Sequence, residues 1–163
     1  MEFDAFVMTD DDWTEFDPAL ISYFDAHDDR RVVATVLPRV VEVLKFALRN
    51  GAAGQLEPRD ELSIDAAIKL VFAAKLMPKV LLPLFEGIAE IGDLFRRDQQ
   101  MSFADGRAVT ALSRHRTTVD DLLRTKGCDG IGETDPRKAF AAYCIMAVEM
   151  TVTMTKLLRG DQT

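Results

Sequence analysis

Few residues in this chain have types and spacings that could support catalysis or metal binding. Histidine occurs only as His27 and His115. Neither lies in a HExxH or Glu-x-x-His pattern, the helical arrangements that bind zinc or paired iron ions. We predict that His27 is a surface residue near a helix end and that His115 lies on the solvated face of a later helix. No metal site and no bound cofactor are therefore expected.

Three further features lack the residues that would complete a catalytic site. The loop 127–135 has three glycines ahead of a helix, but its acidic residues would repel phosphate and do not follow calcium-loop spacing. Cys128 has no histidine placed by the sequence to activate its thiol. Glu149 interrupts an apolar helix, yet its polar neighbours favour a stripe that reaches solvent over a buried carboxylate site. The sequence thus predicts a non-enzyme, and a cofactor- or metal-binding bundle is the last of three hypotheses.

Charge is distributed unevenly along the chain. Residues 1–30 contain ten acidic residues and one arginine, whereas residues 31–163 contain 17 acidic and 19 basic residues. Basic residues gather in the segment 103–126, which predicts a helix face that could contact nucleic-acid phosphates. The candidates are Arg107, Arg114, Arg116 and Arg124. A pI of about 4.8 and the lack of interleaved aromatic residues oppose this alternative, in which the acidic N-terminus would compete for the basic face.

The first 16 residues form an acidic, aromatic-rich N-terminal arm without a clear helical period. Six of the 13 aromatic residues of the chain lie within residues 1–24. Acidic residues interspersed with large apolar ones are typical of segments that bind partners. The alternative is that the rings pack on the body of the protein while the carboxylates stay in solvent. If the arm contacts a partner, the expected contacts are Asp10, Asp11, Asp12, Trp13 and Phe16.

Hydrophobic periodicity predicts an all-α fold, a single compact bundle of about six helices over residues 17–160. The expected helices cover residues 17–27, 29–50, 63–77, 78–97, 103–126 and 136–158. Pro38 lies inside the second of these and is expected to kink or restart it. The last helix is apolar nearly all round, which is typical of the central helix of a bundle.

The leading functional hypothesis is a non-enzymatic protein-binding module, similar in role to a chaperone, an immunity protein or a regulator. It would use the acidic arm and a helical groove, for which Met146, Met150 and Met154 offer an adaptable face. The longest apolar run has ten residues, 139–148, so no membrane span is expected. Two cysteines form no disulfide framework, and the N-terminus has no signal-peptide pattern; both favour a reducing cytoplasm. Self-association is left open.

Overall fold

The computed structural model describes residues 8–51, 62–125 and 134–160. Within these ranges it contains seven α-helices, one short 3-10 helix and no strand, which confirms the all-α prediction. The elements are α1 (Asp10–Phe16), α2 (Leu20–Asp25), α3 (Asp29–Asn50), α4 (Ile64–Ala73), η1 (Lys79–Leu81), α5 (Leu82–Arg97), α6 (Gly106–Thr125) and α7 (Pro136–Leu158).

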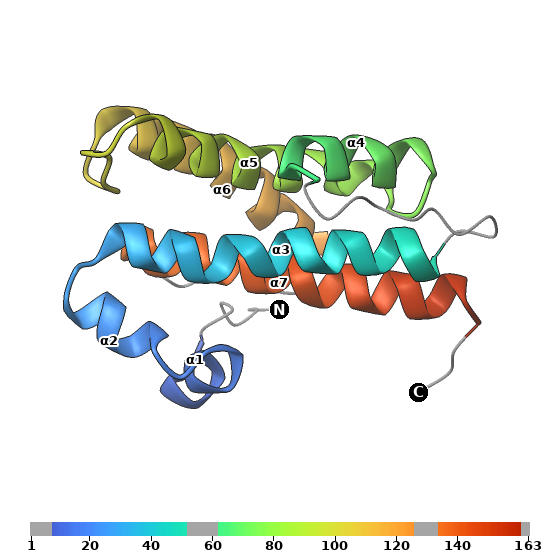
Figure 1. Cartoon of the computed structure of the whole chain (residues 1–163), viewed down its shortest axis with the longest axis horizontal. Coiled ribbons are helices and arrows are strands. Elements are labelled where there is room, and N and C mark those ends of the chain that lie inside the picture. The colour runs from blue at the N-terminus through green and yellow to red at the C-terminus, as the bar shows by residue number, and fades with distance from the viewer. Residues whose placement is uncertain (1–7, 52–61, 126–133, 161–163) are drawn as a thin grey trace.

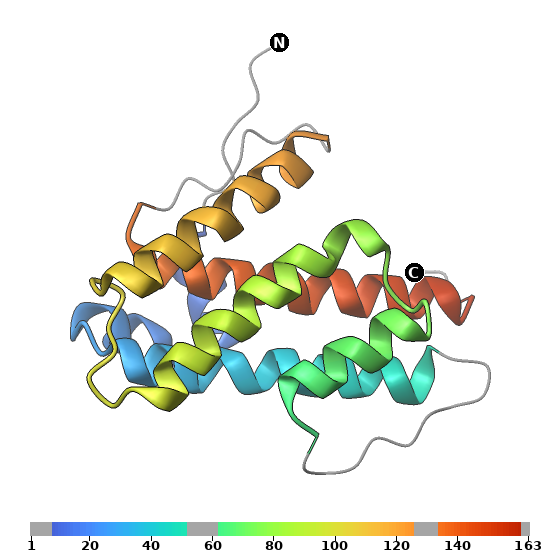
Figure 2. The ribbon, with the colours of Figure 1, turned by 90° about the horizontal axis from the view of Figure 1, so that it is seen from above.

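The helices form three layers, which Figure 1 shows from the side. The long helices α3 and α7 lie side by side in the middle layer and run in the same direction. Helices α1 and α2 lie on one side of this pair, and α4, α5 and α6 lie on the other. Helix α5 runs opposite to α3, and α6 returns beside α5 (Figure 2). This arrangement places the acidic N-terminal helix and the basic helix α6 on opposite sides of the molecule.

Local sequence signals explain where the long helices begin. The Ser63 hydroxyl accepts a hydrogen bond from the backbone N–H of Ala66 (3.2 Å), and the Asp135 carboxylate accepts one from Arg137 (3.1 Å). Each side chain satisfies an N–H group that has no partner within its helix. Helix α3 continues through Pro38 and does not restart there. The predicted starts of α4 and α7 are therefore confirmed, and the restart that was one of the two effects expected of Pro38 is absent.

Several helix boundaries differ from the predicted ones. Helix α5 begins at Leu82, four residues later than expected, because residues 79–81 form the 3-10 helix η1. The Asp17 carboxylate accepts from the backbone N–H of Ala19 (2.9 Å), which makes a turn, so that α2 begins three residues later than expected. Helix α4 ends before the predicted proline stop, and Lys75 then adopts a left-handed conformation with φ of 59°. Helix α6 begins at Gly106, three residues later than expected, and the Asp105 carboxylate accepts a hydrogen bond from the N–H of Arg107 (2.9 Å).

Helix α7 is the central helix, as predicted. Its first half is buried on every side, including Phe140 and Tyr143, while its last turn reaches solvent at Leu157, which is 63% exposed. By length and composition α7 is also the one helix among the described residues that could cross a membrane, although half of the apolar window is buried inside the bundle. A core helix meets the same criterion, so this is weak evidence for a membrane span.

A buried ion pair joins the start of α3 to the start of α7. Asp29, only 7% exposed, accepts hydrogen bonds from Nε of Arg137 (2.6 Å) and from the backbone N–H of Phe103 (2.9 Å). The adjacent Arg30 donates to the carbonyl of Phe95 (2.8 Å) near the end of α5. Two consecutive residues of α3 therefore position the middle layer, the α5–α6 connection and the end of α5.

Candidate functional site

The acidic arm is partly helical, which the sequence analysis did not predict. Residues 10–16 form α1, closed at its start by a capping box between Thr9 and Asp12. The Thr9 hydroxyl accepts from the N–H of Asp12 (3.2 Å), and the Asp12 carboxylate accepts from the N–H of Thr9 (2.8 Å). The signal was present in the sequence, because a threonine followed three residues later by a carboxylate is a helix-start pattern. Residues 1–7 lie outside the described part of the arm.

Trp13 fixes α1 to the bundle. Its side chain is 2% exposed and its ring meets that of Phe24 edge to face, with 5.0 Å between ring centroids. Burial of a ring of this size stabilises the docked helix by roughly 2–3 kcal/mol. The ring would reach a partner only if α1 left the bundle. We therefore assign to Trp13 the role of an anchor in place of the partner contact expected from the sequence.

The anchored helix displays four carboxylates in solvent. Asp10, Asp11, Asp12 and Glu15 are all exposed, and none of them forms an ion pair with any described residue. Asp12 is held in place by the capping box, whereas the other three are free to meet a ligand. A short rigid helix with unpaired negative charge on its outer side is thus the geometric result of burying Trp13.

A hollow of about 330 Å³ lies beside this acidic helix, between α1, α3 and α7. Phe16 forms one wall, and the guanidinium of Arg39 stacks over its ring at 4.5 Å while donating to the Phe16 carbonyl (3.2 Å). Ile145 and the exposed carboxylates of Glu15 and Glu149 complete the hollow. The hollow therefore combines apolar walls with negative charge and already accommodates one guanidinium from the protein itself.

The basic face of α6 has a different character, because its arginines are already paired with carboxylates. Arg107 lies 2.8 Å from Asp98, and Arg114 lies 2.7 Å from Glu90 on the neighbouring helix α5. Within α6 itself, Arg116 pairs with Asp120 (3.8 Å) and Arg124 with Asp121 (3.4 Å). Pairing lowers the positive potential that phosphate contacts require. The acidic helix α1 does not cover this face, since it lies on the far side of the α3–α7 layer (Figure 1).

Comparison with known proteins adds no identity. No family model, no curated protein and no solved structure matches this chain. Its function must be inferred from the geometry and charge of its own residues.

The remaining chemical candidates form no catalytic arrangement. Glu149 is exposed on α7, and the exposed His27 adopts a left-handed conformation with φ of 52°. Burial raises the pKa of the Cys144 thiol well above its ordinary value, which disfavours the thiolate needed for reactivity. Cys128 and positions 127–133 of the glycine-containing loop lie outside the described residues. Across 8–51, 62–125 and 134–160, no three side chains of metal-ligating type lie close enough to hold an ion.

His115 is not on the surface, contrary to the sequence prediction. It is 3% exposed, its ring packs against the backbone of Gly87, and its centroid lies 4.6 Å from that of Tyr143. Neither ring nitrogen, nor the Tyr143 hydroxyl, makes a hydrogen bond with any residue that the structure describes. Burial lowers the pKa of His115 to about 4, although the nearby carbonyl of Leu84 opposes part of this shift. His115 is therefore a neutral packing residue between α5 and α6 at neutral pH.

The low pKa of His115 predicts a specific acid sensitivity. Between the ordinary pKa of 6.5 and about 4, the unfolded chain binds a proton that the folded protein does not. The free energy of unfolding should therefore fall by up to about 3 kcal/mol as the pH is lowered through this interval. The His115→Leu variant has no histidine at this position. Its free energy of unfolding, relative to that of the native protein, should therefore rise by that amount from pH 7 to pH 4. Urea denaturation at several pH values measures the difference, and parallel pH profiles would contradict the assignment.

Proposed function

We propose that this protein is a non-enzymatic binding module that holds a basic segment of a partner protein against α1. The observation that carries the proposal is the contrast between the two charged helices. The carboxylates of α1 are exposed and form no ion pair within the described ranges, whereas the arginines of α6 each have an acidic neighbour. Unpaired surface charge steers an oppositely charged partner and selects against partners of like charge.

The hollow beside α1 gives this surface a means of selecting lysine or arginine side chains. The aliphatic stem of such a side chain would contact Phe16 and Ile145, while its charged end would meet Glu15 and Glu149. Arg39 supports the idea, because its guanidinium already stacks on Phe16 in the same hollow. The hollow is lined by one cation, Arg39, and by three carboxylates, those of Asp12, Glu15 and Glu149. The net charge of the hollow is therefore negative.

The proposal leaves the biological role at the level of a chaperone, an immunity protein or a regulator. A reducing, cytoplasmic setting stays part of it and is supported by Cys144, which is a buried free thiol. No observation favours the nucleic-acid alternative, since the arginines on which it depends are engaged with carboxylates of the protein itself.

Neutralising α1 tests the proposal. The triple variant Asp10→Asn, Asp11→Asn, Glu15→Gln is expected to bind a peptide of alternating lysine and glycine about tenfold more weakly, because three screened charge pairs are lost. Fluorescence anisotropy with a labelled peptide at physiological salt measures the change. The substitutions avoid Asp12 and Trp13, so the capping box and the anchor of α1 are preserved.

A matched control separates a site on α1 from the overall charge of the protein. The variant Glu42→Gln, Asp120→Asn, Asp121→Asn changes the net charge equally at positions on α3 and α6, away from α1. This control variant should bind the peptide of alternating lysine and glycine nearly as tightly as the native protein does. Equal weakening by the two triple variants would show that the peptide responds to net charge alone, and the proposed site on α1 would be rejected.

A further inference from the structure

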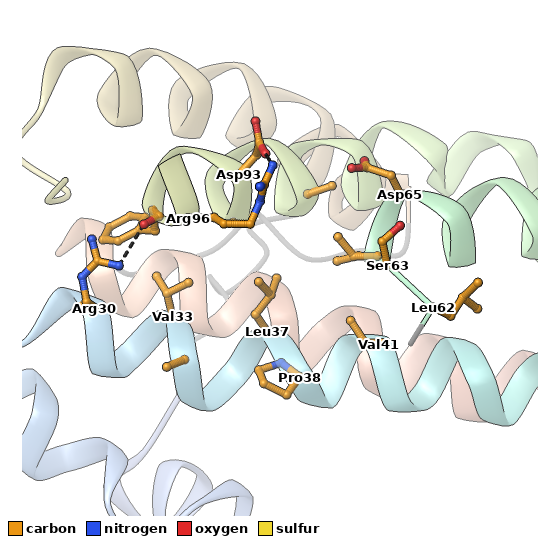
Figure 3. Close-up of a pocket in the computed structure, with 15 residues that line it drawn as sticks. Arg30, Val33, Leu37, Pro38, Val41, Leu62, Ser63, Asp65, Asp93 and Arg96 are labelled. Carbon is orange, nitrogen blue, oxygen red and sulfur yellow. Dashed lines mark hydrogen bonds and ion pairs between the residues drawn. The ribbon is translucent and has the colours of Figure 1, made fainter. Parts of the chain in front are cut away.

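A second, separate feature of the surface is an open apolar groove of about 840 Å³ between α3, the start of α4 and α5 (Figure 3). Its volume lies within the range of about 300–1,000 Å³ that is common for ligand-binding clefts. Apolar residues of α3 line one side, and Leu37, Pro38 and Val41 lie along it in Figure 3. Ala34 and Pro38 are exposed there, so the groove offers apolar surface to solvent.

Close contact between α3 and α5 forms the floor of this groove. A side chain at Gly92 would place its Cβ 2.8 Å from a methyl group of Leu37, so the Leu37 side chain would have to move to admit it. Pro38 has no N–H group, and the carbonyl of Ala34 therefore lacks its usual partner one turn later. Leu37 and Gly92 therefore lie in close contact below the groove, and the Ala34 carbonyl is left without its intrahelical donor.

The charges around the groove indicate which occupant fits. Half-buried Arg30, at one end, donates to two backbone carbonyls, which use its N–H groups and leave its charge in place, and Arg96 is paired with Asp93 on the rim. Asp65, at the α4 end, has neither an ion pair nor a side-chain hydrogen bond with a described residue, and Glu86 lines an adjoining hollow with it. The α4 end of the groove therefore carries an exposed negative charge, and an apolar occupant with a positive charge at that end is complementary to it.

We propose that the groove binds an amphipathic α-helix of a partner protein, with its apolar face against α3 and α5 and a lysine or arginine beside Asp65. The α3 side of the groove runs from Arg30 to Val41, which at 1.5 Å per residue is about 16 Å, or three helical turns. Three turns present apolar anchors at positions i, i+3 or i+4, and i+7, the spacing by which a helix occupies a groove. The groove is partly open to solvent, which suits an elongated helix better than a small molecule that needs enclosure.

Two designed helical peptides test this proposal. Both carry the same leucine face, and their flanking residues are lysine in one and glutamate in the other. The native protein should bind the lysine peptide more tightly, as measured by fluorescence anisotropy at physiological salt. Ala34→Trp places an indole in the groove at an exposed position, and it should weaken binding of the lysine peptide about tenfold or more.

Two further variants separate the groove from other surfaces. Val109→Trp adds the same ring at an exposed site on α6 and should leave binding unchanged. Asp65→Lys should reduce binding of the lysine peptide about tenfold and improve binding of the glutamate peptide. Circular dichroism checks that each variant is folded. If Ala34→Trp does not fold, Asp65→Lys alone provides the test.

The result that would overturn the proposal is equally specific. Native affinity in folded Ala34→Trp, or equal affinity for the two peptides, would reject a helix-binding groove. Affinity unchanged in both Ala34→Trp and Asp65→Lys, together with displacement of the peptide by a small alkylammonium compound, would also reject it. Ala34→Trp leaves every carboxylate of α1 in place, so its failure would not affect the function proposed for that helix.

Discussion

Asp29→Ala is expected to lower the free energy of unfolding by about 3 kcal/mol, because it removes the buried carboxylate of an ion pair and leaves Arg137 with Asp135 (3.1 Å) as its remaining acidic partner. Asp29 accepts from Arg137 Nε at 2.6 Å and from the N–H of Phe103 at 2.9 Å. In the variant the guanidinium, with 15% side-chain exposure, would lose its buried carboxylate, and a buried backbone N–H would lose its acceptor. Urea denaturation followed by circular dichroism measures the loss.

Asp28→Ala is the matched control for this prediction. Asp28 precedes Asp29 and caps the N–H of Arg31 from a more exposed position, so its removal should cost about 1 kcal/mol, as for other helix caps. The double variant Asp29→Ala, Arg137→Met should recover part of the stability lost by Asp29→Ala, since the interior no longer holds a guanidinium that has lost its buried carboxylate. If Asp29→Ala cost no more than Asp28→Ala, the ion pair would not be the link between the layers that its geometry indicates.

The sequence predicted best those elements whose signals are local. Helix α3 is long and periodic, and α4 and α7 begin at a serine and an aspartate that each cap a backbone N–H. Helix α1 was missed because seven residues contain too few turns to show a period, although Thr9 and Asp12 form a recognisable helix start. Short helices depend on tertiary packing for their stability, and the burial of Trp13 could not be read from the sequence.

His115 shows how the surrounding residues can outweigh a charged local context. Its neighbours Arg114 and Arg116 suggested a solvated face, yet His115 lies three residues after Leu112 and four before Val119. These two residues are buried, and spacing of three and four places all three side chains on one side of α6. Following the apolar stripe through the histidine would have predicted its burial. The sequence offers no comparable signal for the pairs Arg114–Glu90 and Arg137–Asp29, which join residues far apart in the chain.

The candidate site followed from composition only in part. Concentrated negative charge correctly located an exposed acidic surface, since Asp10, Asp11 and Asp12 all face solvent. Composition could not separate the rings that anchor the arm from the residues that stay accessible, because both types alternate along the same short segment. The structure assigns Trp13 to the interior and leaves Phe16 half-buried beside a charged hollow.

Trp13→Ala is expected to cost about 3–5 kcal/mol of unfolding free energy, because a fully buried aromatic ring is removed at the only contact that anchors α1 deeply. Phe16→Ala, on the same helix but half-buried, should cost about 1 kcal/mol. Trp13 is the one tryptophan of the chain, so its fluorescence reports on the docking of α1 directly. Emission should be blue-shifted and poorly quenched by iodide, and it should change in urea together with the circular dichroism signal.

The same variant separates an anchor from a contact residue. If Trp13 holds α1 in place, Trp13→Ala loses stability. It also binds the peptide of alternating lysine and glycine more weakly, because the carboxylates of α1 no longer share one orientation. Trp13→Phe should restore much of both, since a smaller ring can still pack against Phe24. If the indole were itself a contact, quenching by iodide would be efficient, stability would change little, and only binding would suffer. The anchor assignment requires stability and binding to fall together, and this makes the acidic surface of α1 a consequence of its packing.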